Sequence, residues 1–135
     1  MIEINNLTDF PIDNKLFSTV AKKVLSGENR ETETLSLAFV DGQEIKKLNK
    51  KFRDKNEATD VLSFDIKEEG YLGEIVICPE IVKENAIEDG ALPEKELFKV
   101  FIHGILHLCG YDHEKSEKEA EVMKMLQEKY LSEIK

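Results

Sequence analysis

The stretch from Pro93 to Leu108 constrains the fold more than any other part of the sequence, because it has helical character and is apolar on almost every side. Pro93 suits the first helical position, and Glu94 and Glu96 follow in the first turn, where acidic side chains are favourable. A helix that is apolar nearly all round belongs in the centre of a core. The sequence therefore predicts a central buried helix, whose apolar residues are Leu97, Phe98, Val100, Phe101, Ile102, Ile105, Leu106 and Leu108.

All three histidines of the chain lie in the last part of this stretch or just after it, in the segment HGILHLCGYDH. His103 and His107 are four residues apart, so a helix projects both rings from one face. Gly110 permits a turn through positive φ, which brings His113 back toward the other two. Three imidazoles with a fourth position open are typical of a catalytic zinc site. We therefore predict one bound Zn²⁺, while noting that such ligands also accept nickel, copper or cobalt.

Two other interpretations of the histidines remain open. They can be core residues bonded to the backbone, or ligands of a structural zinc site that takes a fourth ligand such as Cys78. Their spacing also matches the metzincin pattern, except that Gly104 stands where that pattern has its glutamate general base. This departure argues against a metalloprotease. We expect Gly104 to leave room for substrate or for another helix.

The remaining segments alternate between strand and helix patterns. Asp41 and Ser116 begin helices as N-caps, and the first of these helices is expected to turn Ile45, Leu48 and Phe52 inward. The order of elements predicts an α+β fold: one domain over residues 1–135, with a mixed sheet of about four strands and about five helices. The expected strands are 1–4, 35–40, 61–66 and 72–77, the last two as an antiparallel hairpin, and the expected helices start near residues 13, 41, 79, 93 and 116.

The overall charge of the chain argues against a nucleic-acid partner, because its net charge is −9 and phosphate binding needs cations. A basic cluster nevertheless stands on the helix after Asp41, and it is either a solvated helix face or a phosphate-facing patch. The two cysteines, Cys78 and Cys109, are interpreted as core thiols of a reducing cytoplasm, and we expect no membrane segment. The cluster comprises Lys46, Lys47, Lys50, Lys51 and Arg53.

Three segments together resemble the YbeY family of bacterial rRNA maturation factors. They are HGILHLCGYDH, LNKKFRDKNEATDVLSF at residues 48–64, and YLGEIVI at residues 71–77. The resemblance spans roughly residues 35–113, more than half of the chain. The histidine segment is its most specific part, and the upstream block supports it.

The resemblance implies a zinc-dependent, single-strand-specific endoribonuclease with a zincin-like central helix. Such an enzyme acts in 16S rRNA 3′-end maturation and in ribosome quality control, with single-stranded RNA, ribosomal RNA and ribosomal or small-subunit proteins as partners, and no DNA. Carried over by position, the metal ligands are His103, His107 and His113, and the functionally important arginine is Arg53. A non-catalytic RNA-binding factor of ribosome assembly, with a metal site, is the alternative.

The chain departs from the family pattern in two loop positions. Asp54 follows Arg53 where the family usually has glycine, and Ala58 precedes Thr59 and Asp60 where it usually has proline. The roles of Thr59, Asp60 and Ser63 are not assigned. Asp112 is either a proton acceptor beside the site or a turn carboxylate that orients a histidine.

Overall fold

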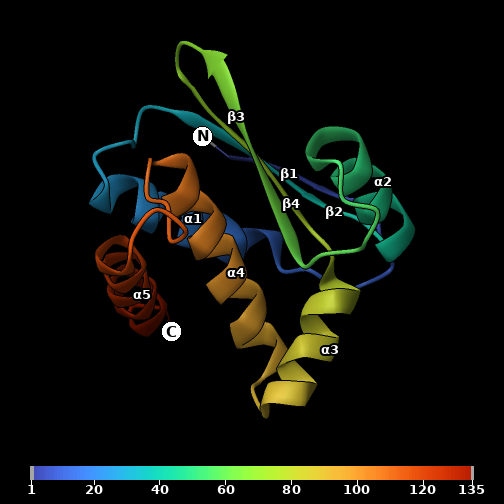
Figure 1. Ribbon diagram of the computed structural model, residues 1–135. Coiled ribbons are helices and arrows are strands. Elements are labelled where there is room, and N and C mark those ends of the chain that lie inside the picture. Colours follow the sequence, from blue (N-terminus) through green and yellow to red (C-terminus); the bar gives the residue numbers. More distant parts are fainter. Residues whose placement is uncertain (1, 135) are drawn as a thin grey trace.

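Four strands form one mixed sheet, in the spatial order β1-β2-β4-β3 (Figure 1). The computed structural model describes residues 2–134, except for the side chain of Lys67. β1 pairs with β2, and β2 with β4, in parallel, whereas β3 and β4 form the predicted antiparallel hairpin and leave β3 at the edge. The strands are β1 (Ile2–Asn6), β2 (Thr34–Phe39), β3 (Val61–Glu68) and β4 (Tyr71–Ile77). Met1, part of the first expected strand, lies outside the described residues.

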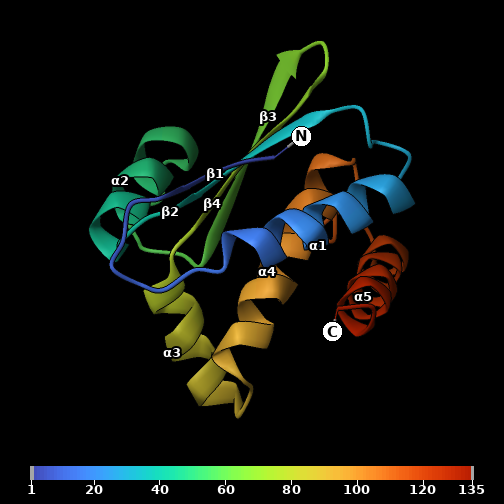
Figure 2. The ribbon, with the colours of Figure 1, turned by 180° about the vertical axis from the view of Figure 1, so that it is seen from behind.

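Five helices surround the sheet, and not all of them lie against it. α2 lies on one face, whereas α1 and α4 lie against the other, as the two opposite views show (Figures 1 and 2). The predicted α+β class, with about four strands and about five helices, is confirmed. The helices are α1 (Asn14–Gly27), α2 (Gly42–Arg53), α3 (Pro79–Asp89), α4 (Pro93–Leu108) and α5 (Glu117–Ser132).

Helix starts follow the capping residues of the sequence. The carboxylate of Asp41 accepts the N–H of Glu44 at 2.9 Å, and the hydroxyl of Ser116 accepts the N–H of Glu119 at 3.1 Å. Asp13 does the same for α1, accepting the N–H of Leu16 at 3.1 Å. Each contact satisfies a backbone donor that the first turn of a helix leaves free.

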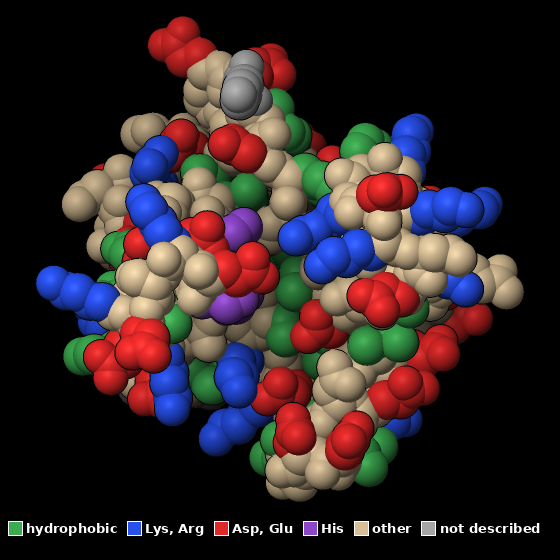
Figure 3. All heavy atoms as spheres, in the orientation of Figure 1, with side chains coloured by type: hydrophobic (Ala, Val, Ile, Leu, Met, Phe, Trp, Pro, Cys, Tyr) green, Lys and Arg blue, Asp and Glu red, His purple; other side chains and the backbone are tan. Residues whose placement is uncertain are grey.

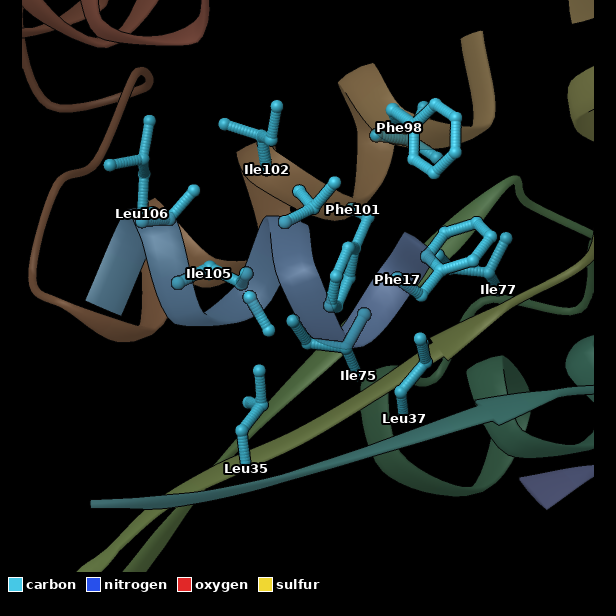
Figure 4. Packing of buried hydrophobic residues seen from close by; sticks show 14 of the residues in the cluster. Phe17, Leu35, Leu37, Ile75, Ile77, Phe98, Phe101, Ile102, Ile105 and Leu106 are labelled. Atoms are coloured by element: carbon cyan, nitrogen blue, oxygen red, sulfur yellow. The ribbon is translucent and has the colours of Figure 1, made fainter. Parts of the chain in front are cut away.

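Alternate residues of β4 belong to two separate hydrophobic clusters, one on each face of the sheet. Ile75 and Ile77 are fully buried in the larger cluster with α1 and α4, whereas Val76 belongs to a smaller cluster with Ile45 of α2. This follows from the two-residue period of a strand, which turns successive side chains to opposite faces. Figure 4 shows the larger cluster, in which side chains of α4 point toward those of the sheet. Each such side chain contributes about 1.5–3 kcal/mol by leaving water.

Gly104 lies where α4 packs closely against the sheet. A Cβ placed on it would lie 3.1 Å from Cδ1 of Ile75 and 3.2 Å from Oγ of Ser63. The space left by Gly104 is therefore occupied by β4 and β3, and the expectation that it admits substrate or another helix is wrong. The missing side chain serves the close approach of helix and sheet.

Phe52 differs from its expected inward orientation, because its side chain is 57% exposed while Ile45 is fully buried. The ring lies at the last turn of α2, where it makes one T-shaped contact with Phe64, the centroids 5.2 Å apart. Asp54, one residue beyond the helix, adopts the left-handed conformation with φ of +56°. The family usually has glycine at this position, and glycine adopts the left-handed conformation easily. Asp54 adopts it as well, because aspartate tolerates this conformation better than most residues.

Both cysteines are free, as expected, and burial raises the pKa of each thiol, to about 11 for Cys109. Cys78 is completely buried in the smaller cluster. Among the helices of residues 2–134, none combines the length and the apolar character needed to cross a membrane.

The close packing at Gly104 predicts a large effect of a branched side chain. We expect Gly104→Val to lower the free energy of unfolding by about 1–3 kcal/mol, because the side chains of Ile75 and Ser63 must move. Urea unfolding followed by circular dichroism measures the change. Gly42→Ala is the control, since nothing lies within 4 Å of a Cβ at that position. Equal stability of Gly104→Val and the unaltered protein would contradict this packing.

Candidate functional site

A cleft of about 620 Å³ opens between α4 and the edge strand β3, and eight of the residues singled out from the motifs line it. Figure 3 shows the histidines at the surface of this face, between acidic and basic side chains. The motif residues that line the cleft are Arg53, Thr59, Asp60, Ser63, His103, His107, Asp112 and His113. Glu96, Lys99, Glu114 and Gln127 also line it, and none of these was expected from the sequence.

The three histidines reach the cleft from a helix and a loop. His103 and His107 stand on α4, and Gly110, with φ of +107°, lets the chain turn back after that helix. The rings of His103 and His113 face one another in a T-shaped arrangement, their centroids 5.0 Å apart. The predicted return of His113 toward the helix therefore occurs.

Two of the histidines have their Nδ1 atoms engaged. Gln127 of α5 bonds through Oε1 to Nδ1 of His103, and the carbonyl of Tyr111 lies 3.1 Å from Nδ1 of His107. These contacts fix the ring orientations and turn both Nε2 atoms away from their partners, as is usual for histidines that bind metal. Burial lowers the pKa of His103, as do the neighbouring histidines, while the bond to Gln127 opposes this. A neutral imidazole is the form that binds a metal.

The donor set of the cleft fits a metal ion by its chemistry. Imidazoles suit zinc and its neighbours, and three of them leave a coordination position open. In their present rotamers, however, no three His, Cys, Asp or Glu side chains within residues 2–134 form a group close enough for one ion. Binding of one ion by all three histidines would therefore require a shift such as that of the exposed His113, whose ring lacks, within the described part of the chain, the Nδ1 contact that holds each of the other two.

Arg53 enters the cleft from the other side of the sheet. It is the last residue of α2, and the segment that follows passes along the cleft to β3. Asn49, the buried polar residue of α2, holds this segment by donating from Nδ2 to the carbonyl of Glu57 at 2.9 Å. The Thr59 hydroxyl is 3.3 Å from Oδ1 of Asp60, so these two residues interact within the loop.

Asp112 has the geometry of a turn carboxylate. Its Oδ1 accepts the N–H of Glu114 at 3.0 Å, while its own N–H donates to Oε1 of Glu119 at 3.1 Å. Of the two roles considered for Asp112, these bonds favour stabilisation of the loop that carries His113.

Glu28 ties the same loop to the first and last helices. Its carboxylate accepts the hydroxyl of Tyr111 at 2.8 Å and that of Tyr130 at 2.5 Å. Burial is the larger cause that raises the pKa of Tyr130, and the bond to Glu28 is the main cause that raises the pKa of Tyr111. Both hydroxyls therefore stay protonated as donors. Through Tyr111, whose carbonyl meets His107, this cluster helps to set the position of a histidine.

The mixed sheet, the buried helix and the histidine-lined cleft define a single-domain α+β protein built around a central histidine-bearing helix. A family model described as "Endoribonuclease YbeY" matches residues 3–135. The chain therefore belongs to the YbeY family, which confirms the resemblance drawn from its motifs.

Individual relatives support this membership. The protein called Endoribonuclease YbeY in Bdellovibrio bacteriovorus is 52% identical over 99 residues, 73% of this chain and 65% of that protein. The aligned part thus spans slightly less than two thirds of that relative. Its namesake in Persephonella marina is 39% identical over 135 residues, covering 96% and 88% of the two chains.

A solved structure agrees with the fold. The solution structure of TM1509 from Thermotoga maritima superposes with a TM-score of 0.75 and is 40% identical in sequence. The match covers 99% of this chain and 89% of the other.

The contact between Gln127 and His103 predicts an effect on metal affinity. We expect Gln127→Ala to weaken Zn²⁺ binding about 10- to 100-fold, because His103 loses the partner that orients it. Competition with a chromophoric chelator measures the affinity. Gln127→Glu keeps an acceptor oxygen and should retain most of it.

The other glutamine of the chain, Gln43, provides a matched control, since it is exposed on α2. Gln43→Ala should bind Zn²⁺ as the unaltered protein does. If Gln127→Ala also did so, the bond to His103 would have no part in metal binding.

Proposed function

We propose that this protein is a metal-dependent endoribonuclease that cleaves single-stranded RNA in the cleft beside α4. We further propose that it acts in the cytoplasm on the 3′ end of 16S rRNA, in maturation and quality control of the small ribosomal subunit. The names of the relatives support an endoribonuclease role. The observation that carries the proposal is that one cleft holds the three histidines together with Arg53.

His103, His107 and His113 are the residues that would hold the metal, and zinc is proposed because three imidazoles with an open position are typical of its catalytic sites. When bound, such an ion supplies a Lewis acid and lowers the pKa of bound water toward 7. Within the chain itself, Gln127 and the carbonyl of Tyr111 orient His103 and His107.

Arg53 is suited to the phosphate of the substrate. Its guanidinium is always protonated and offers paired donors to phosphate oxygens, on which negative charge grows during cleavage. Lys99 also lines the cleft but is paired with Glu96 at 3.6 Å. Arg53 is therefore assigned as the main phosphate-binding residue of the cleft.

The acidic total of the chain does not oppose this proposal, since its charges are unevenly placed. Figure 3 shows Lys and Arg side chains gathered over the region of α2, on the same face as the histidines. A local basic surface of this kind binds phosphate within a protein whose net charge is negative.

A non-catalytic RNA-binding factor of ribosome assembly is the second candidate. It too would have a metal site, and the observation that favours it is the gathering of Lys and Arg side chains over α2 (Figure 3), which can bind RNA without cleaving it. A metalloprotease is not favoured, because the residue after His103 is a glycine whose missing side chain faces the sheet.

Cleavage of a labelled single-stranded oligoribonucleotide by the zinc-loaded protein tests the proposal. We expect His107→Ala to abolish cleavage and Arg53→Ala to lower its rate about 100-fold, the usual effect of losing one donor to the transition state. The same oligonucleotide annealed to its complement should remain intact.

Arg30→Ala is the matched control, because Arg30 is the only other arginine and pairs with Glu33 outside the cleft. It should cleave RNA normally. Cleavage that persisted in a variant lacking all three histidines would come from a contaminating nuclease and would leave the binding factor as the better proposal. The role in rRNA maturation is tested in cells that lack the gene, where 16S rRNA with an unprocessed 3′ end should accumulate. The unaltered gene should correct this accumulation, and the gene that carries Arg53→Ala should not.

A further inference from the structure

Phe52 is an exposed aromatic ring beside the cleft. Of its surface, 57% is accessible, and it is the only aromatic residue among the large hydrophobic side chains that remain exposed in residues 2–134. Its contact with Phe64 fixes the ring from one side without covering it. An exposed phenylalanine lacks the stabilisation that burial of its ring would provide. A ligand that covers the ring of Phe52 would gain this free energy on binding.

One cation contacts this ring, and three more lysines are exposed on the same helix. Nζ of Lys51 lies 5.2 Å from its centroid, within the range of a cation–π contact. Lys46, Lys47 and Lys50 are exposed on the same helix, and none of them takes part in the ion pairs found within the described residues. The end of α2 therefore combines an open aromatic surface with unpaired positive charge.

Phe52 is also adjacent to the cleft through the chain itself. Arg53, the next residue, lines the cleft together with the histidines, so the two side chains start from neighbouring Cα atoms. A ligand that crosses from the cleft onto α2 meets Arg53 and then Phe52.

A single-stranded RNA has the chemistry that this combination recognises. Its unstacked bases present flat faces that stack on aromatic side chains, and its phosphates need cations at short intervals. A protein partner could also bury an aromatic residue, but it would not require four exposed lysines on the helix that carries the ring. The density of cations favours the nucleic acid.

We propose that Phe52 is a base-stacking platform for single-stranded RNA. One base stacks on its ring, while Arg53 and the lysines of α2 bind the adjacent phosphates. This rests on the proposed function, since it describes how the substrate of that same cleft is held, and it adds a subsite outside the histidine cluster.

Phe52→Trp tests the platform directly, because the natural chain contains no tryptophan. Indole fluorescence should be quenched on addition of a single-stranded oligouridine in metal-free buffer at low salt, saturating at the same concentration as the anisotropy of the labelled RNA. Ile87→Trp is the control. Ile87 is 65% exposed on α3 and does not line the cleft, so its fluorescence should not change.

Phe52→Leu separates stacking from packing. Leucine keeps an apolar contact with Phe64 but has no aromatic face, so folding stability should be nearly unchanged while RNA affinity falls about 5- to 150-fold. An abasic oligonucleotide of equal length should bind Phe52→Leu and the unaltered protein alike, because it has no base to stack.

Distinct results overturn the platform and the proposed function. RNA that binds Phe52→Trp without quenching, or binds Phe52→Leu with unchanged affinity, overturns the platform alone. If Phe52→Leu lost only its association with ribosomal particles, the ring would be a protein contact. Quenching in a protein that never cleaves RNA supports the platform and overturns the nuclease. Absence of any RNA binding overturns both.

Discussion

The close contact of α4 with the sheet at Gly104 is the interaction on which the cleft depends. Because this residue has no Cβ, the helix backbone can lie against Ile75 and Ser63. His103, the preceding residue, and His107, one turn later, are thereby held beside the edge strand β3. A larger residue would separate helix and strand and would move both rings relative to Arg53.

Around this fixed helix, two loops are held by side chains from distant parts of the chain. Glu28 holds the segment after α4 through Tyr111 and connects it to α5 through Tyr130. Asn49 holds the segment after α2 through the carbonyl of Glu57. The cleft therefore has one rigid wall, the buried helix α4, and two loops that hydrogen bonds hold in position. These bonds are buried or partly buried, so leaving one of them unmade would cost stability.

Much of the fold followed from periodicity, because buried strands and an all-round apolar helix leave few alternatives. The burial of α4, the β3–β4 hairpin and the helix caps were all predictable on this basis. The exposure of Phe52 was not, since its spacing from Ile45 and Leu48 is that of an inward residue, and only the fold shows that no other element covers it.

The histidines and Arg53 were found in the sequence because they belong to compact motifs, whereas their supporting residues were not. Glu28 lies 83 residues before Tyr111, and no local pattern links them. Gln127 did leave a signal, as a polar residue on a stripe otherwise formed by Met123, Leu126 and Tyr130, but its partner was not deducible. Side chains that act through tertiary contacts require the fold to be known.

Because Gln127 and Tyr130 lie in α5, they are synthesised after the histidines that they support. The histidines emerge from the ribosome before the helix that orients them, so a nascent chain carries the cleft residues without their supports. The cleft becomes complete only when α5 has been made and has docked against α4. A protein proposed to cut RNA would thus gain its cleft only after the helix that follows its histidines is in place.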